Sequence, residues 1–437
     1  MKLKILLCMQ LAWLMTVWPI NAAFAQMPCI TEHYSTEDGL SHDVITSIYK
    51  DRQGYMWFGT WDGLNRFDGS KFAVFKSSAG DSSQINNNRI DQITEDRYDH
   101  LWIKAYDAQV YRFDKTTGRF LSLAILLKLK EKINVDKILS VDEDCMWLST
   151  LKSGIIGVSG INSSGLSCRQ YKQGAAENYR LPSNNIRFFY QDKEGRKWIG
   201  TSNGLVCLQK QQKSNRYVVA NPGIHAKEDF ISVAESRSQL FYGTKSGTLY
   251  VFNKQKKQFR VQQVSNAGIN GVLIDHSETN AYLTTGSGEL ITITIKTGSI
   301  TRSVYPAGGA LYSLYEDHLG VLWIEPGVKG VIQYTPPTQK FKTFSQKNDA
   351  KSTKYDNHFK VMEDHNGVVW CVLRDGGFGY YDNKTDEFKY FYNEPGTKDR
   401  RFSNLITIAF YDPAGVFWFH TDEHGLEKII LQPNILI

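Results

Sequence analysis

Short apolar and aromatic runs, separated by Gly, Asp, Asn and Lys, follow one another from about residue 30 to residue 430. Runs with this alternation predict β-strands rather than helices. In the first complete unit we expect four strands: VITSIYK (44–50), YMWFGT (55–60), LNRFD (64–68) and KFAVFK (71–76). Successive side chains of a strand point to opposite faces, so both faces of this small antiparallel sheet carry bulky groups.

The same unit returns along the chain. Taking the aromatic residue of WFGT (57–60) as an anchor, successive anchors are 41 to 51 residues apart. The anchors are Trp57, Trp102, Trp147, Trp198, Phe241, Tyr282, Trp323, Trp370 and Trp418. A period in the forties with several strands per unit is typical of β-propeller blades. A sheet that cannot bury both faces alone is expected to stack between two neighbours in a ring.

Most units also share a DxxG motif ahead of the anchor. An Asp lies six residues before the anchor at Asp51, Asp96, Asp192, Asp317, Asp364 and Asp412, and Gly often follows three positions later. Asp can accept hydrogen bonds from turn amides, and Gly tolerates a positive φ, so the motif predicts a hairpin turn. We therefore interpret these acids as turn residues.

The segment YSTEDGLSHDVITSIYKDRQGYMWFGTWDGLNRFDGSKFAVF (34–75) resembles the first blade of the two-component regulator propeller repeats. Such repeats form the periplasmic sensors of hybrid histidine kinases in glycan-degrading gut bacteria. The resemblance extends over about residues 30–428 and is weaker in units five and six, which lack the DxxG turn and the Trp. It implies an all-β propeller of four-stranded antiparallel blades. In that family a β-sandwich, a membrane span and kinase, receiver and DNA-binding modules follow. None of these is in the sequence, so we expect an excised sensor fragment or a truncated gene product.

The number of blades in the ring depends on which strand closes it. CITEHYS (29–35) occupies the place of an outermost strand and must pair with a later third strand. The resemblance implies seven blades over residues 29–335, closed on GVIQYT (330–335), with the prolines of TPPTQ (335–339) as the break. Residues 336–437 would then form two blades of an incomplete second propeller. The alternative is a single ring of nine blades.

The N-terminus combines Lys2 and Lys4 with an apolar stretch and small residues before position 26. This layout predicts a signal peptide over residues 1–25 and an exported, periplasmic protein. The alternative, a retained membrane anchor, requires a longer apolar stretch. Later segments are too short to span a membrane, so we expect membrane contact only through segments downstream of this sequence.

Charge and cysteine content exclude several classes. The net charge is +6, or +4 without the signal lysines, and the basic residues are dispersed, which argues against nucleic-acid binding. Five cysteines follow the signal at irregular spacing with no CxxC pair, a poor framework for disulfides or zinc. We expect buried, unpaired thiols, no metal and no cofactor.

An enzymatic function is not favoured by the motifs. A lyase or glycosidase needs two carboxyl groups facing one substrate, whereas these acids recur as turn residues. HTDEHG (420–425) lacks zinc-site spacing, and the vicinal cysteines of quinone-dependent propeller dehydrogenases are absent. We therefore expect no catalytic residues.

Binding is the remaining class, and the variable loops of a rigid scaffold are where recognition usually lies. We expect the loops between second and third strands, and between successive units, to share one face. Aromatic plates beside amide and charged groups suit an oligosaccharide. The candidate ligand-binding residues are Trp61, Asp62, Asn88, Arg89, Tyr106, Asp107, Lys152, Asn185, Arg187, Asn203 and Lys245.

The sequence thus predicts a non-enzymatic periplasmic sensor for a fragment of a glycan. The resemblance implies that ligand binding changes how two sensor chains associate, in a homodimer of the full-length sensor, and so controls the kinase. The alternatives are a protein–protein interaction scaffold that uses the same face and, third, a carbohydrate-active lyase or glycosidase.

Overall fold

The computed structural model describes residues 29–77, 85–129, 132–142, 145–161, 166–211, 217–220, 223–224, 226–327, 330–344, 359–373, 377–391, 405–421 and 425–431. The expected signal peptide lies outside these residues. Their secondary structure is β-strand apart from three short helical segments, η1 (Thr36–Asp38), α2 (Leu123–Leu126) and η2 (Glu177–Tyr179). The all-β class predicted from the sequence is therefore confirmed.

Nine four-stranded antiparallel sheets make up the described fold, and each is one blade. Blade 1 contains β2 (Ile45–Lys50), β3 (Met56–Thr60), β4 (Gly63–Phe67) and β5 (Phe72–Phe75); blade 2 contains β6 (Ile90–Glu95), β7 (Leu101–Ala105), β8 (Val110–Asp114) and β9 (Arg119–Ser122); blade 3 contains β10 (Val135–Val141), β11 (Cys145–Thr150), β12 (Ile155–Ser159) and β13 (Ser167–Tyr171). Blade 4 contains β14 (Ile186–Gln191), β15 (Lys197–Thr201), β16 (Gly204–Lys210) and β17 (Tyr217–Ala220); blade 5 contains β18 (Phe230–Glu235), β19 (Gln239–Thr244), β20 (Thr248–Asn253) and β21 (Gln258–Gln263); blade 6 contains β22 (Ile269–Ile274), β23 (Asn280–Thr285), β24 (Glu289–Thr294) and β25 (Ile300–Val304). Blade 7 contains β26 (Leu311–Glu316), β27 (Leu322–Pro326), β28 (Val331–Thr335) and β29 (Lys340–Phe344); blade 8 contains β30 (Phe359–Glu363), β31 (Val369–Leu373), β32 (Gly377–Asp382) and β33 (Glu387–Phe391); blade 9 contains β34 (Ile406–Asp412), β35 (Val416–Thr421), β36 (Gly425–Leu431) and β1 (Cys29–Tyr34).

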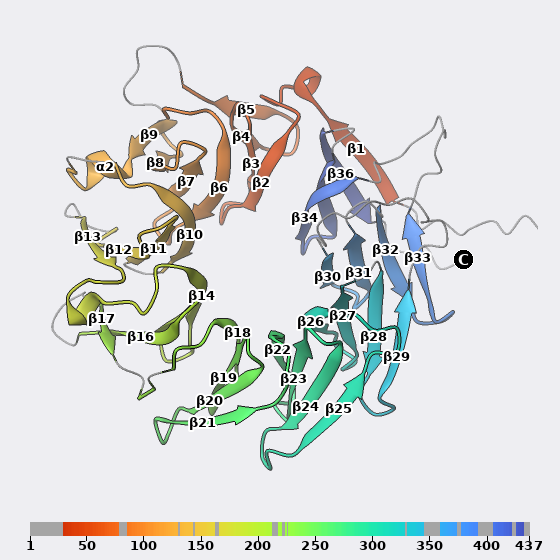
Figure 1. Cartoon of the computed structure of the whole chain (residues 1–437). Coiled ribbons are helices and arrows are strands. Elements are labelled where there is room, and N and C mark those ends of the chain that lie inside the picture. The colour runs from red at the N-terminus through yellow and green to blue at the C-terminus, as the bar shows by residue number, and fades with distance from the viewer. Residues whose placement is uncertain are drawn as a thin grey trace, which may run out of the picture.

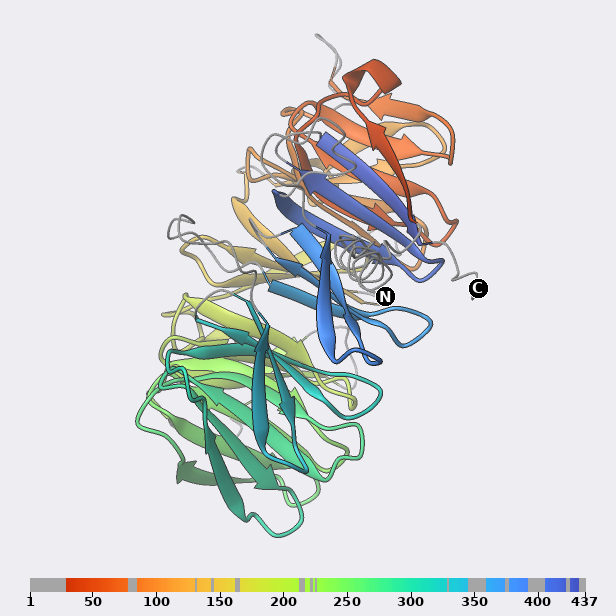
Figure 2. The ribbon, with the colours of Figure 1, turned by 90° about the vertical axis from the view of Figure 1, so that its right-hand side faces the viewer.

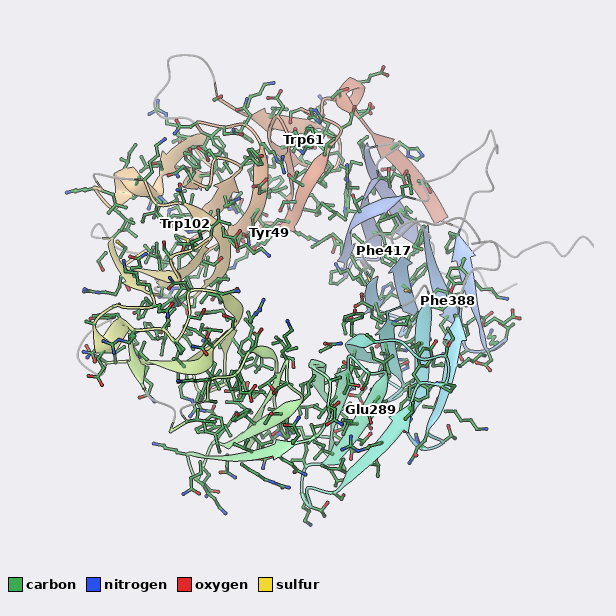
Figure 3. The ribbon with its side chains drawn as sticks, viewed as in Figure 1. Tyr49, Trp61, Trp102, Glu289, Phe388 and Phe417 are labelled. Atoms are coloured by element: carbon green, nitrogen blue, oxygen red, sulfur yellow. The ribbon has the colours of Figure 1, made fainter. Side chains whose placement is uncertain are left out.

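The blades follow one another around a ring, and the first strand of each lies toward its centre (Figure 1). Seen from its side, the ring brings the N-terminal strands against the C-terminal ones (Figure 2). Nine clusters of buried apolar side chains fill the nine interfaces between neighbouring blades. In Figure 3 the side chains of Trp102 and Phe417 illustrate how bulky groups fill the space between sheets. Each blade thus covers both of its apolar faces with its neighbours.

The ring closes through the N-terminal strand. Strand β1 pairs antiparallel with β36, with Cys29 opposite Leu431 and Tyr34 opposite Leu426. The cluster between blades 9 and 1 combines Trp418 and Leu426 with Phe58. The same strand therefore supplies the last blade with its outermost ladder and joins the two ends of the chain.

The prediction of seven blades plus two is wrong, and the alternative of a single ring of nine is confirmed by the strand pairing. The expected closing strand, β28, pairs with β27 and β29 within blade 7. Pro336 and Pro337 lie in the turn between β28 and β29, where Thr338 N–H donates to the Thr335 carbonyl. A turn does not need the N–H that proline lacks, so these prolines end a strand without ending the ring.

Charged side chains connect blades on the face that carries the DxxG turns. Lys115 of blade 2 donates to both Asp51 of blade 1 and Glu95 of blade 2, and all three side chains are almost fully buried. Lys50 of blade 1 pairs with Asp412 of blade 9 at 2.6 Å. Buried pairs of this kind are costly when one partner is removed.

We expect a chain ending at Thr335 to lose cooperative folding. It removes the partner of β1, the outer strand of blade 7 and the cover of one face of blade 7. A matched chain ending at Leu431 keeps all 36 strands and should melt like the full-length protein. Circular dichroism melting and size-exclusion chromatography make the comparison. A soluble, sharply melting monomer ending at Thr335 would contradict closure by β1 and β36.

The acid stability of the ring should depend on Asp51 and Asp96. Burial raises the pKa of Asp51, but hydrogen bonds from Lys115 and Trp57 outweigh it and leave the pKa below the usual value of 3.8. Burial likewise raises the pKa of Asp96, and bonds from His100 and Trp102 bring it below that value.

A depressed folded-state pKa contributes stability at neutral pH that is lost as the pH falls through that pKa. The urea concentration at the midpoint of unfolding of the native protein should therefore decrease as the pH is lowered below about 4. The double variant Asp51→Asn, Asp96→Asn should be less stable at pH 7. Its urea midpoint should also change less as the pH is lowered. Glu177→Gln, at an exposed position, is the control. If the urea midpoint of the double variant depended on pH as that of the native protein does, Asp51 and Asp96 would not be the cause of the acid sensitivity.

Candidate functional site

The DxxG turns occupy one face of the ring, where they serve the fold. In blade 7 the Asp317 carboxylate accepts bonds from the backbone N–H groups of Leu319 and Val321 through Oδ1. Its Oδ2 accepts the indole N–H of Trp323 at 2.8 Å. Gly320 has a φ of 77°, which a side chain rarely tolerates. The predicted hairpin turns are confirmed.

The bond from the anchor Trp to the turn Asp recurs, and it was not foreseen from the sequence. Five Trp side chains donate to the Asp six residues earlier, at distances of 2.8 or 2.9 Å. Trp147 lacks an Asp at that spacing, and among the described residues its buried indole nitrogen has no hydrogen-bond partner. The fixed six-residue spacing was the available signal. Each of these five carboxylates therefore holds the anchor Trp in place.

The opposite face carries the variable loops and most of the exposed apolar side chains outside the outermost strands. Trp61, Tyr106 and Leu151 lie in the loops between second and third strands of blades 1, 2 and 3. They are 49%, 58% and 70% exposed. Ile125 of α2 is 59% exposed, and α2 belongs to the connection between blades 2 and 3. We call this side of the ring the loop face.

Two of these aromatic rings are joined by one guanidinium group. The Arg89 Cζ atom lies 4.2 Å from the ring centroid of Tyr106 and 5.3 Å from that of Trp61. The His42 ring adds a contact with Trp61 at 5.7 Å between centroids. Trp61, Arg89 and Tyr106 form what we call the aromatic platform, and Figure 3 labels Trp61 at the edge of blade 1.

A β-bulge places the residue that orients Arg89. In blade 2 the ladder slips between Ile90 and Gln92, which leaves Asp91 outside the regular pairing. A bulge re-aims a side chain. Asp91 accepts from Arg89 Nε at 3.2 Å and from Lys104 Nζ at 2.6 Å. The same slip after the first residue of the inner strand occurs in seven blades. Neither Asp91 nor Lys104 was among the predicted site residues, because the repeat pattern does not indicate which residue a bulge projects.

Asp62 and Asn88 are hydrogen-bonded to each other and to neighbouring residues. Asn88 donates from Nδ2 to Asp62 at 2.9 Å, and Lys76 donates to the same carboxylate at 2.9 Å. Partial burial raises the pKa of Asp62, but these two bonds outweigh it and leave the pKa below its usual value. Asn88 also accepts from the backbone N–H of Ser77. Both residues therefore connect the loops that carry Trp61 and Arg89.

The other predicted residues are on the loop face but do not join the platform. Asp107 accepts bonds from the Tyr111 hydroxyl and the Gln109 backbone. Arg187 makes a two-pronged pair with Asp229 of blade 5, at 2.7 and 2.8 Å. Lys245 approaches the same residue through a backbone bond to the Asp229 carbonyl. Arg187 is therefore part of the contact between blades 4 and 5, whereas the bond of Lys245 lies within blade 5.

Lys152, Asn185 and Asn203 contribute mainly backbone contacts. The Lys152 carbonyl accepts from Asn184, and the Asn185 carbonyl accepts from the Ser202 N–H. The Asn203 N–H donates to the Thr201 hydroxyl. All three are exposed and come from blades 3 and 4. All three lie in loops between strands, as the sequence predicted, but these contacts are to neighbouring loop residues and not to the aromatic platform.

The described residues offer little for metal or thiol chemistry. No group of three or more His, Cys, Asp or Glu residues in the described ranges could hold a metal ion. Among the described residues, Cys145, Cys168, Cys207 and Cys371 form no disulfide, and all but Cys168 are buried. Burial raises the pKa of the Cys207 thiol to about 12, which opposes a nucleophilic role. Among the described residues, no helix has the length and apolar character needed to cross a membrane.

Comparison with known proteins matches two segments to a family. Residues 39–62 and 180–203 match the two-component regulator propeller repeat. The first segment begins directly after η1 and ends in the loop that bears Trp61, and the second ends in the corresponding loop of blade 4. Two segments of the chain, in blades 1 and 4, thus match this repeat family. The resemblance inferred from residues 34–75 is thereby confirmed.

Proteins similar to these repeats include signalling proteins. A 57-residue stretch is 37% identical to histidine kinase P4 of Formosa agariphila, which is 13% of this chain and 4% of that protein. The extracellular domain of the putative hybrid two component system BT4673 of B. thetaiotaomicron shares 17% identity, with 90% of this chain and 57% of that chain covered and a TM-score of 0.36. The extracellular domain of the putative hybrid two component system BT3049 of B. thetaiotaomicron shares 16% identity, with 91% of this chain and 65% of that chain covered and a TM-score of 0.31. The chain thus spans less than two thirds of these relatives.

Replacing Asp317 with Ala should lower the free energy of unfolding by about 1–3 kcal/mol, because it leaves the buried Trp323 N–H unpaired. Asp114→Ala is the matched control, since Asp114 caps an exposed turn through the N–H groups of Thr116 and Thr117 without contacting an indole. Urea denaturation should show the smaller loss for the control. Equal losses would mean that the bond to the indole contributes nothing beyond the turn.

Proposed function

We propose that this propeller is a non-enzymatic sensor that binds an oligosaccharide derived from a glycan on its loop face. It would be exported to the periplasm as the sensor part of a hybrid two-component system. The repeat match in blades 1 and 4 supports the assignment to signalling. The segment similar to a histidine kinase supports it as well.

The aromatic platform is the observation that carries the proposal. A sugar ring presents an apolar face that stacks on an aromatic side chain and hydroxyl groups that need hydrogen-bond partners. About half of the Trp61 side chain is open for such stacking. The Nε atom of Arg89 donates to Asp91. Its terminal nitrogens have no hydrogen bond to a described residue and can donate to a ligand. The platform therefore combines an aromatic ring for stacking, that of Trp61, with a hydrogen-bond donor held in place, the guanidinium group of Arg89.

The neighbouring residues would hold the platform in its binding geometry. Asp62, Asn88 and Lys76 tie the Trp61 loop to the segment before β6. Asp91 fixes the direction of Arg89. Since the loops are braced before a ligand arrives, binding costs less ordering entropy. A ligand that bridges the platform of one chain and a second chain would favour association of the two sensors and so alter kinase activity.

A second candidate, a docking face for another exported protein, is favoured by one specific observation. Ile125 and Leu151 are exposed on the same face as Trp61, and neither offers a hydrogen bond to a sugar. Exposed apolar groups of this size are typical of interaction surfaces. The two functions differ in which side chains they require.

Trp61→Ala should abolish or strongly weaken oligosaccharide binding while leaving the melting temperature of the unliganded protein nearly unchanged. A ligand at a hundredfold excess over its Kd stabilises the native protein by about 2.7 kcal/mol, which a thermal-shift screen of glycan fragments detects. Arg89→Met should weaken binding as well. Leu319→Ala is the control, because Leu319 is 61% exposed in a DxxG turn on the opposite face.

The outcomes separate the candidate functions. Binding that survives Trp61→Ala would refute the platform as the sugar site. Loss of a protein partner in Ile125→Ser and Leu151→Ser, with no stabilisation by any glycan fragment, would favour the docking face. Release of reducing ends from the fragments would overturn the assignment as a non-enzyme and favour the carbohydrate-active alternative.

A further inference from the structure

The interface between blades 5 and 6 lacks the Trp that most blades place between sheets. At the preceding interface Trp198 packs on Phe252 and Phe259, with 5.1 Å between the centroids of Trp198 and Phe252. The anchor of blade 5 is Phe241. Among the described residues, Phe241 contacts no other aromatic ring, and the cluster around it consists otherwise of aliphatic side chains and Ala281.

Smaller side chains also replace the aromatic residues that receive the anchor. Phe252 of blade 5 is paired with Leu240 and Phe259 on its flanking strands. Ile293 occupies the same place in blade 6, where it is paired with Ala281 and Ile300. Each of the three positions thus carries a smaller side chain in blade 6 than in blade 5. The side chains at this interface are therefore smaller than those between blades 4 and 5, where Trp198 packs against Phe252 and Phe259.

A pocket of about 260 Å³ lies at this interface. Its apolar lining includes Phe241, Leu249, Val251, Ile293 and Ile295. Small-molecule pockets usually measure about 300–1,000 Å³, so this one accommodates a single ring rather than a chain of sugars.

The mouth of the pocket is cationic and rich in amides. Lys256 and Arg260 line it together with the side chains of Gln239, Asn253, Gln258 and Gln262, and no acidic residue is part of the lining. Arg260 donates from Nη2 to Gln262 at 2.9 Å, which holds the guanidinium along β21. An adjoining hollow that shares Gln239 and Ile295 adds Lys296, beside Glu278.

We propose that this pocket binds a small ring carboxylate, with its ring against Phe241 and Ile293 and its carboxylate at Arg260 and Lys256. Arginine suits a carboxylate because its planar N–H groups match the two oxygens. The amide side chains can satisfy hydroxyl groups on the ring. The ligand class therefore includes single sugar acids and aromatic acids.

The pocket is independent of the aromatic platform. It lies between blades 5 and 6 among β19, β20, β21 and β24, whereas the platform lies on loops of blades 1 and 2. A failure at one site therefore leaves the other intact. Trp61→Ala should not change binding of a ring carboxylate.

Isothermal titration of the whole chain with glucuronate, benzoate and glucose tests the proposal. We expect saturable binding of at least one carboxylate and none of glucose. Glucuronate alone would identify a sugar-acid site, and benzoate alone an aromatic-acid site. Arg260→Gln should weaken binding by at least about tenfold, as expected for loss of a charge-assisted bond. Arg302→Gln is the matched control, because Arg302 lies on β25, lines no pocket described here and faces Glu289.

Phe241→Trp provides a second test that does not remove charge. It restores the anchor of most other blades and adds an indole ring where the pocket lies, so it should block binding without lowering the melting temperature. No saturation by either carboxylate, equal binding of glucose, or full binding in both Arg260→Gln and Phe241→Trp would overturn the proposal.

Discussion

Each blade of this protein is a sheet with two apolar faces, and that requirement for two neighbours governs the architecture. A finite row of such sheets always leaves two faces open to water, whereas a ring leaves none. The nine clusters of buried side chains, one at each interface, show the requirement met everywhere in the described fold. The pairing of β1 with β36 completes the last blade, and the cluster between blades 9 and 1 covers the last two faces.

The same repeat divides the two sides of the ring between stability and recognition. On one side, the turn Asp fixes its hairpin through one carboxylate oxygen and the anchor Trp through the other. On the loop side no such constraint repeats, so the loops differ in sequence between blades. There a bulge frees Asp91 to hold Arg89 between Tyr106 and Trp61. A rigid scaffold with variable loops is a common basis for binding.

The sequence was sufficient to predict the strands and the hairpin turns of each blade. Strands expected at 44–50 and 55–60 appear as Ile45–Lys50 and Met56–Thr60, and the turn glycines have positive φ. The number of blades in the ring could not be predicted from the sequence, because the pattern within a blade is the same in a ring of seven or nine. The prolines after Thr335 were interpreted as a break between two rings, because proline is equally suited to a break and to the turn in which these prolines lie.

The site was only partly predictable for a related reason. Trp61, Arg89 and Tyr106 were correctly placed on loops, yet the sequence could not tell that they meet while Arg187 instead pairs with Asp229. Which side chain crosses to the next blade depends on the bulges and on the angle between sheets. The sequence shows that blade 5 lacks the anchor Trp, but the pocket beside Phe241 is also lined by Ile293 and Ile295 of the following blade, which the repeat pattern does not indicate.

Closure between residues 29 and 431 also bears on why a ring can vary in blade number. The entropy lost when the ends of a chain meet grows only with the logarithm of its length. Enlarging a ring from seven blades to nine therefore adds only about 0.2 kcal/mol to that loss, far less than one buried aromatic side chain contributes. Evolution by duplication of a blade would thus meet almost no penalty from chain length. The tilt of one sheet against the next, set by side chains as large as Trp or as small as Ala281, would decide how many copies complete the circle.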